Sequence, residues 1–203
     1  MDAINKLAEL FKDFPGIGPG QAKRFVYYLL YRNNGFSEDL IHAVKDLNKE
    51  IIQCEECMRY FAGPEHSRGT KICSICSDKH RDDSMLMIVP RDIDFEAVEK
   101  SGSYKGHYFV LGGSLPILEK EPEKRIRIEK LQETINKKQK TLKEVILAMN
   151  ANADGENTAD YLKEKFKSLN FTISVLGRGL STGAELEYAD PETLKTAFLH
   201  RTK

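Results

Sequence analysis

The sequence has no net charge, because its 31 lysine and arginine residues are matched by 31 aspartate and glutamate residues. A neutral chain creates no overall field that draws it to nucleic acid or to an anionic membrane, so any contact with a polyanion has to be local. No apolar run approaches the length of a membrane span, and the charges of Asp2, Lys6 and Glu9 are not those of a signal peptide. We therefore expect a cytoplasmic protein that does not bind membranes.

The sequence also lacks a Gly-Lys-Ser/Thr motif, low-complexity tracts and evident internal repeats. The first absence excludes a Walker-type phosphate loop, and the others give no sign of a disordered tract or a repeat array. The chain does have 203 residues with 40% apolar side chains, which is enough for a hydrophobic core. We expect one α/β domain of moderate size with small modules attached.

Cysteine is scarce, and all four cysteines lie in one stretch as two C-x-x-C pairs. Fifteen residues separate the pairs, which is typical of a structural zinc site with four thiolate ligands: Cys54, Cys57, Cys73 and Cys76. Gly63, Pro64 and Gly69 supply turns between the pairs. Two disulfides, or four unconnected cysteines, are the alternative. His66 and His80 lie nearby and are interpreted as solvated loop residues, because the cysteine set is already complete.

The first 30 residues predict two helices joined by a glycine turn. Ile4, Leu7, Leu10 and Phe11 share one helix face, and a second helix follows at 21–30 after the sequence Pro-Gly-Ile-Gly-Pro-Gly. This pattern resembles the helix-hairpin-helix, which binds the DNA backbone without reading its sequence. In that interpretation the hairpin lets peptide N–H groups approach a phosphate and basic side chains add charge, which assigns the contact to Gly16, Gly18, Lys23 and Arg24.

A purely structural turn is the alternative interpretation of this hairpin. Residues 1–53 hold seven basic and seven acidic side chains, so a single motif on this neutral module is expected to bind weakly. Useful binding would then need several copies acting together. A third helix is predicted from an N-cap at Ser37 through Ile51.

After residue 82 short apolar runs alternate with helical patterns, which predicts a parallel sheet with crossover helices. The expected strands are 85–89, 107–111, 145–149 and 171–176, and the expected helices are 92–100, 122–138 and 156–169. Ligands of such a sheet lie at the carboxyl ends of its strands. The last segment predicts a helix begun by Asp190-Pro191, which could pack on a second subunit or on its own sheet.

The order of these parts resembles one family, the bacterial recombination mediator RecR. The resemblance spans nearly the whole chain and is carried by the hairpin at 14–19, the cysteine ribbon, Val-Leu-Gly-Gly at 110–113, the segments 144–150 and 154–159, and Glu-Leu-Glu-Tyr-Ala-Asp at 185–190. It implies a multi-module α/β protein: a helix-hairpin-helix module at 1–53, a four-cysteine zinc ribbon at 54–76, a Rossmann-like Toprim domain at 82–176, and a C-terminal loop and helix at 177–203.

The same resemblance implies a homo-oligomer, a dimer or a tetrameric ring that encircles DNA, and partnership with RecO and RecF in placing RecA on single-stranded gaps. It implies a protein of the nucleoid in the cytoplasm. These are implications of the resemblance, and composition and spacing do not supply them.

The chain departs from the Toprim pattern where enzymes of that type hold magnesium. Pro90 stands at the first carboxylate position, and Asn150 and Asn152 replace an Asp-x-Asp pair, which argues against catalysis because neutral amides hold Mg²⁺ poorly. Asp154 and Glu156 could make a weak magnesium contact or a partner contact. The alternative is that Asp154 and Gly155 form a loop before a helix, with Glu156 in the first turn of that helix. The alternatives to a non-enzymatic mediator are a metal-dependent nuclease or topoisomerase-like enzyme and a zinc-ribbon adaptor that binds only protein.

Residues 120–143 carry nine basic and four acidic side chains. A surface that faces DNA or a partner is one interpretation of this excess, and a solvated helix face is the interpretation we favour at the level of sequence.

Overall fold

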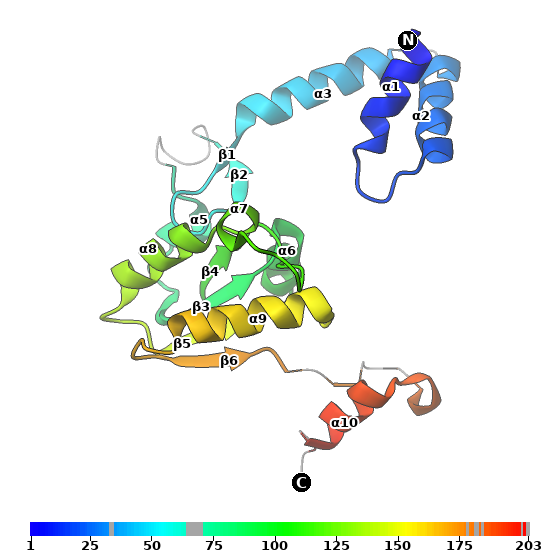
Figure 1. The fold of residues 1–203 in the computed structure, drawn as a ribbon. Helices are drawn as coiled ribbons and strands as arrows, with labels where there is room; N and C mark the ends of the chain where they lie inside the picture. Colours follow the sequence, from blue (N-terminus) through cyan, green and yellow to red (C-terminus); the bar gives the residue numbers. More distant parts are fainter. Residues whose placement is uncertain are drawn as a thin grey trace. The chain divides into compact units, whose positions relative to one another are not determined.

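The computed structural model describes residues 1–32, 35–63, 71–177, 179–180, 183, 185–199 and 201 (Figure 1). Contacts divide the chain into one unit at Met1–Ile51 and a second unit at Ile52–Lys203. The loop residues Pro64, His66 and Gly69 of the predicted ribbon lie outside the described residues.

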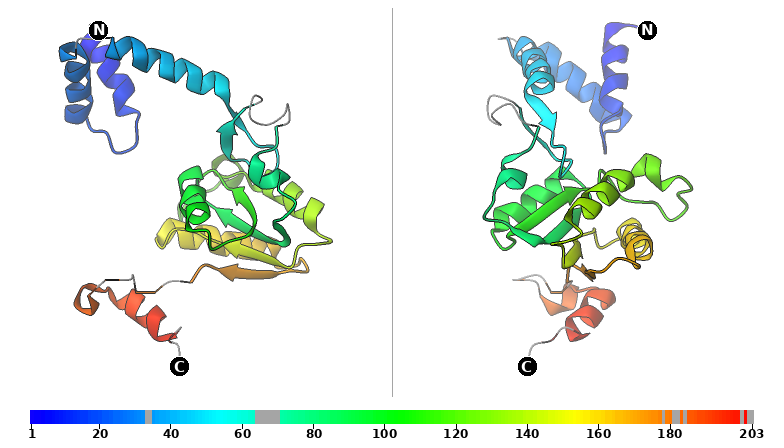
Figure 2. Two further views of the ribbon diagram at one scale, coloured as in Figure 1. Left: turned by 180° about the vertical axis from the view of Figure 1, so that it is seen from behind. Right: turned by 90° about the vertical axis from the view of Figure 1, so that its left-hand side faces the viewer.

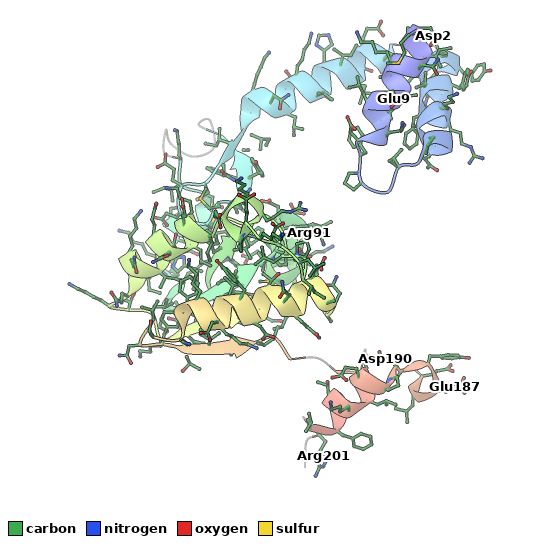
Figure 3. The ribbon with its side chains drawn as sticks, viewed as in Figure 1. Asp2, Glu9, Arg91, Glu187, Asp190 and Arg201 are labelled. Atoms are coloured by element: carbon green, nitrogen blue, oxygen red, sulfur yellow. The ribbon has the colours of Figure 1, made fainter. Side chains whose placement is uncertain are left out.

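The first unit starts with two helices, α1 (Ala3–Lys12) and α2 (Pro19–Tyr31), that pack on each other. Asp2 caps α1 by accepting a hydrogen bond from the Asn5 N–H at 2.8 Å (Figure 3). Small residues let the two backbones approach, and the buried set is Ala8, Ala22 and Val26. The helix pair predicted from the sequence is therefore present.

The third helix, α3 (Phe36–Glu50), starts differently from the prediction. Gly35 is the N-cap residue in place of Ser37, because its φ of 76° turns the chain and its carbonyl accepts from the Asp39 N–H at 2.9 Å. Ile51, predicted as helical, leaves α3 and begins strand β1. None of the residues of α3 is buried.

The second unit opens with the cysteine ribbon. Strands β1 (Ile51–Gln53) and β2 (Tyr60–Ala62) form a two-stranded sheet, and a single helical turn, α5 (Ser74–Ser77), carries the second cysteine pair. The two strands flank the first pair, so each C-x-x-C sequence is attached to a regular element.

A four-stranded parallel sheet follows, in the order β4 (Gly106–Val110), β3 (Asp82–Val89), β5 (Glu144–Leu147) and β6 (Thr172–Val175). Leu86 is paired with His107 on one side and with Val145 on the other. The central strands are apolar on both faces, as buried parallel strands require. The predicted α/β class is confirmed.

Helices cover both faces of this sheet (Figure 2). On one face α8 (Ile128–Lys138) and α9 (Ala153–Phe166) bury Leu131, Ile135 and Leu162 against the strands. On the other face α6 (Asp92–Ser101) buries Phe95 against Tyr108, with ring centroids 4.8 Å apart. The domain is a three-layer α/β/α structure.

Two helices of the second unit also differ from the prediction in their bounds. The segment 122–138, predicted as one helix, is divided into α7 (Pro122–Arg125) and α8, because Ile126 turns into the core and the Arg127 N–H donates to the Leu111 carbonyl. Helix α9 begins at Ala153, so Asp154 and Gly155, predicted as loop, belong to its first turn.

The C-terminal segment contains a short 3₁₀ turn, η1 (Leu186–Tyr188), and helix α10 (Pro191–Leu199). Asp190 begins α10 as predicted, since its carboxylate accepts from the N–H groups of Glu192 and Thr193 (Figure 3). Among the described residues, no helix combines the length and the apolar character that crossing a membrane requires.

Candidate functional site

The four cysteine side chains converge on one point in the ribbon. Their sulfur atoms all lie within 4.8 Å of one another, with Cys54 Sγ 3.9 Å from Cys76 Sγ and Cys57 Sγ 3.6 Å from Cys73 Sγ. All four are free thiols, so the disulfide alternative is wrong for this structure. His80 is exposed, as predicted for a solvated loop residue.

The sulfur geometry fits a tetrahedral metal ion. A Zn–S bond of about 2.3 Å places the sulfurs of a regular tetrahedron about 3.8 Å apart, close to the spacings found here. Hydrogen bonding from Cys57 lowers the pKa of the Cys54 thiol, whereas hydrogen bonds to the other three cysteines raise the pKa of Cys76. One thiolate thus opposes the ionisation of its neighbours, and a bound cation would remove that conflict. The four cysteines can hold a metal ion.

The backbone around the first cysteine pair is folded back on itself. The Cys73 N–H points to Cys54 Sγ at 3.4 Å, and the Cys54 N–H donates to the Arg59 carbonyl at 2.8 Å. Met58 has a φ of 62° and is the only non-glycine residue with positive φ in the described chain. This left-handed residue turns the chain after Cys57 toward β2.

The knuckle formed by residues 54–58 is hydrogen-bonded to the end of strand β4. The Cys57 carbonyl accepts from the Val110 N–H at 2.8 Å. Arg127 donates from Nη1 to the Met58 carbonyl at 3.1 Å and to the Val110 carbonyl at 3.0 Å. The metal site and the sheet therefore share one hydrogen-bond network.

Sequence reasoning missed this role of Arg127. The available signal was Gly112, which follows a buried strand, has a φ of 93°, and would place a Cβ 3.1 Å from Arg127 Nε. A glycine after a buried strand marks a close approach, but the sequence does not say which side chain approaches.

At the carboxyl ends of the strands, the predicted Toprim positions have structural partners. The Pro90 carbonyl accepts from the Gly112 N–H at 2.9 Å. The Asn152 side chain caps α9 by accepting from the Gly155 N–H at 2.8 Å. Gly155 is buried against Asn150, where a Cβ would overlap the Asn150 carbonyl. Pro90, Asn150 and Asn152 therefore shape the backbone at this edge of the sheet.

Asp154 and Glu156 are exposed in the first turn of α9. Within the described ranges, the cysteine set is the one group of three or more His, Cys, Asp or Glu side chains arranged to hold a metal. Among the residues that the structure describes, no third carboxylate joins Asp154 and Glu156 in a group arranged to hold a metal.

The connection after β4 is fixed on α9. Thr158 is buried, and its hydroxyl accepts from the Leu115 N–H at 2.8 Å, while the Asn157 amide donates to the carbonyls of Leu115 and Pro116 at 3.1 Å. Ile117 and Leu118 follow at 65% and 88% exposure.

The predicted hairpin lies between α1 and α2. Gly16 has a φ of 79°, which other residues adopt with strain, and Gly18 is the N-cap of α2. No side chain caps α2, and Pro19 occupies its first turn. Lys23 and Arg24 are exposed on the next turn, and neither forms an ion pair with a described residue. The four predicted residues thus lie in the segment 16–24, which contains the turn and the start of α2.

Comparison with known proteins agrees with this arrangement. The Toprim domain pattern matches residues 84–177, and the pattern described as "RecR, C-terminal" matches residues 179–202. The protein is thus a Toprim-domain protein with a four-cysteine ribbon.

Three curated relatives cover almost the full chain, and each is named "Recombination protein RecR". The relative from Staphylococcus saprophyticus is 38% identical over 203 residues, 100% of this chain and 98% of its own length. That from Chloroflexus aurantiacus is 35% identical over 96% of this chain and 91% of its own length, and that from Staphylococcus haemolyticus is 36% identical over 100% and 98%. The chain belongs to the RecR family of recombination proteins.

Proposed function

We propose that this protein is a non-enzymatic DNA-binding mediator of recombinational DNA repair. In this proposal the hairpin holds the DNA backbone, the metal ribbon fixes the shape of the module that follows it, and the Toprim domain is a platform for assembly. Its place of action is the nucleoid in the cytoplasm.

The observation that carries the proposal is the geometry of the hairpin. The turn at Gly16 and the uncapped start of α2 leave peptide N–H groups accessible at the positive end of a 13-residue helix. Lys23 and Arg24 add two charges on the adjacent turn. Such a site favours phosphate and does not distinguish bases.

We assign zinc to the four-cysteine site as a structural ion. Four thiolates leave no open coordination position, which a catalytic zinc needs, and sulfur ligands with this spacing favour Zn²⁺.

The second candidate, a Toprim nuclease or topoisomerase-like enzyme, has less support. Such chemistry needs hard carboxylate ligands for magnesium, and the structural contacts of Pro90 and Asn152 give those positions another explanation. Asp154 and Glu156 stay candidates for a partner contact or a weak Mg²⁺ contact.

Self-association is part of the proposal, and the apolar surface of the first unit supports it. An apolar groove of about 590 Å³ lies between α1, α2 and α3, lined by side chains that include Leu7, Phe11 and Leu40. The neighbouring residues Ile41 and Val44 of α3 are 53% and 51% exposed. A second copy of the chain would cover this face, and several hairpins would then act on one DNA molecule.

Partnership with RecO and RecF, and the loading of RecA at single-stranded gaps, enter the proposal from the family resemblance. The exposed side chains of the C-terminal segment, among them Tyr188 at 79% and Phe198 at 68%, supply a further surface for a second copy or a partner.

The test is a DNA titration of the purified protein and of Lys23→Gln/Arg24→Gln, with molar mass measured in the same solutions. We expect the double variant to lose most of its affinity for a gapped duplex. Unchanged affinity would remove the hairpin from DNA binding and favour the zinc-ribbon adaptor. Magnesium-dependent cleavage of the gapped duplex by the wild-type protein would establish the enzyme instead.

The assembly has its own test. Ile41→Asp/Val44→Asp places charge on the exposed apolar face of α3, and we expect it to lower the molar mass of the assembly while leaving the helical content unchanged. A chain that is monomeric at every concentration, with and without DNA, would contradict the proposed assembly.

A further inference from the structure

A second cationic surface lies at the amino ends of β5 and β6, on the edge of the sheet opposite the Toprim positions. There the connection from α8 to β5 and the connection from α9 to β6 enclose an open groove of about 530 Å³. The groove lies between neighbouring strands, since Glu144 pairs with Thr172 and the Thr172 N–H donates to the Lys143 carbonyl at 2.8 Å.

The exposed side chains of this groove are polar, and its lining includes no carboxylate. Lys140 and Lys143 are exposed and line it together with Gln139, Thr141, Asn170 and Thr172. The apolar residues that complete the lining are less exposed: Leu142 is buried, and Leu169 and Phe171 are half-buried. The chain as a whole has equal numbers of acidic and basic residues, but the groove is lined by two lysines and no acidic residue, so it is locally positive.

Part of the positive excess of residues 120–143 lies at this groove, since Lys140 and Lys143 line it. Lys120 and Lys137 of the same segment are exposed outside the groove and form no ion pair with a described residue. Other cations of that segment are paired: Lys124 Nζ lies 2.6 Å from Glu121 Oε1, and Lys130 Nζ lies 2.8 Å from Glu133 Oε2. Arg125 and Lys138 are paired with Glu119 and Asp83.

Lys140 and Lys143 form no ion pair with a described residue. Two carboxylates close to Lys143, those of Asp82 and Glu144, have other hydrogen-bond partners. Hydrogen bonds with Ser84 lower the pKa of Asp82, and the charge of Lys143 contributes to that shift without a direct ion pair. The carboxylate of Glu144 accepts from the Ser174 hydroxyl at 2.6 Å.

We propose that this groove is a second phosphate-contacting surface, in which Lys140 and Lys143 bind the phosphodiester backbone of nucleic acid. Ammonium groups next to Thr, Asn and Gln side chains are the donors that typically contact phosphate oxygens. A docking site for a protein would need well exposed aromatic or large apolar anchors, whereas Leu142 of this groove is buried and Leu169 and Phe171 are half-buried.

The inference rests on the proposed DNA-binding function and extends it to the second unit of the chain. One small hairpin on a neutral module binds weakly, and a second contact on the same chain raises the effective concentration of the first. No base contact is involved, so binding at the groove is independent of sequence.

The test uses the full-length protein with a gapped duplex and a single-stranded oligonucleotide. Lys140→Gln/Lys143→Gln should weaken binding about tenfold at low salt and reduce the slope of log K against log[salt] by about 1.5 to 2. Lys140→Glu/Lys143→Glu should weaken binding further. Thermal unfolding should be unchanged, because both side chains are exposed.

The matched control is Lys124→Gln/Lys130→Gln. It removes the same number of charges from the same segment, but those lysines are already neutralised by ion pairs, so affinity should stay within about twofold of wild type.

The outcomes separate this inference from the proposed function. If Lys23→Gln/Arg24→Gln abolishes DNA binding and both groove variants bind like wild type, the groove proposal is overturned and the proposed function stands. If the control variant weakens binding as much as the groove variant, the effect is one of overall charge and the proposal also fails. A chain that binds neither DNA probe overturns the function itself.

Discussion

The two units of the chain use their apolar residues in opposite ways. In Met1–Ile51 the buried side chains are Ala8, Ala22 and Val26, while Leu30, Ile41 and Leu47 are each more than half exposed. In Ile52–Lys203 the large side chains of the sheet and its helices, such as Phe109 and Leu131, are fully buried. The second unit buries its large apolar side chains, whereas the first leaves many of its own exposed, and the proposed assembly would cover them.

The largest expected effect is on the metal ribbon. Cys57→Ser should lose the bound metal and unfold the knuckle, because structural zinc contributes on the order of 10 kcal/mol to small modules. Hydrogen exchange at the Val110 amide should rise as well, since this N–H donates to the Cys57 carbonyl. Ser77→Ala, an exposed residue of α5, is the control. Metal retained by the Cys57 variant would contradict the four-ligand site.

The same leucine truncation should have different effects in the two units. Leu131→Ala removes a fully buried side chain of α8 and should lower the free energy of unfolding by about 2–5 kcal/mol. Leu47→Ala on α3, where the side chain is 59% exposed, should change it by less than ~0.5 kcal/mol in the dissociated chain. Denaturant titration at low protein concentration measures both. Equal losses would show that α3 is already packed within the single chain.

A pair of glycines gives a smaller contrast. Gly155→Ala should destabilise the protein by about 1–3 kcal/mol, because the new Cβ would meet the Asn150 carbonyl, whose carbon lies 2.9 Å away. Gly18→Ala should lower the free energy of unfolding by less than ~1 kcal/mol. No described atom lies within 4 Å of a Cβ built at this position, and its φ of −84° suits any residue. Thermal unfolding of both variants is the measurement, and a tolerated Gly155→Ala would mean that the Asn150 loop can move.

The smallest expected effect is on the pH dependence of stability, through His107. Burial lowers the pKa of His107 and nearby Lys138 lowers it further, although Asp83 lies 3.1 Å from Nε2 and opposes the shift. Below the ordinary pKa of about 6.5 the unfolded chain binds a proton that the folded chain resists. Stability should therefore fall as pH decreases from about 6.5 toward the folded pKa.

His107→Gln should remove this part of the pH dependence of thermal unfolding. His42→Gln, at an exposed position on α3, is the control and should leave the pH profile unchanged. A wild-type profile that is flat below pH 6.5 would contradict the effect assigned to His107.

The sequence predicted the sheet and the cysteine cluster well for physical reasons. Buried parallel strands are runs of apolar residues, so 85–89 and 107–111 were recognisable, and C-x-x-C spacing is set by the metal geometry. The helix break at Ile126 was not predictable, because it depends on the hydrogen bond from Arg127 to the distant Leu111 carbonyl. Local periodicity carries no information about such a partner. For the same reason, charge counting over 120–143 did not separate the paired lysines from Lys140 and Lys143.

Strand β4 is an edge of the sheet, and several of its backbone groups are bonded to segments outside the sheet. The Gly106 and His107 carbonyls accept from Arg81 and from the Tyr104 hydroxyl, and the Cys57 carbonyl takes the Val110 N–H. Backbone groups that are bonded in this way are not available to a strand of a neighbouring molecule. Unfolding of the ribbon would release the Val110 N–H that the Cys57 carbonyl now holds, so we expect the metal-free protein to associate more readily through this edge of the sheet.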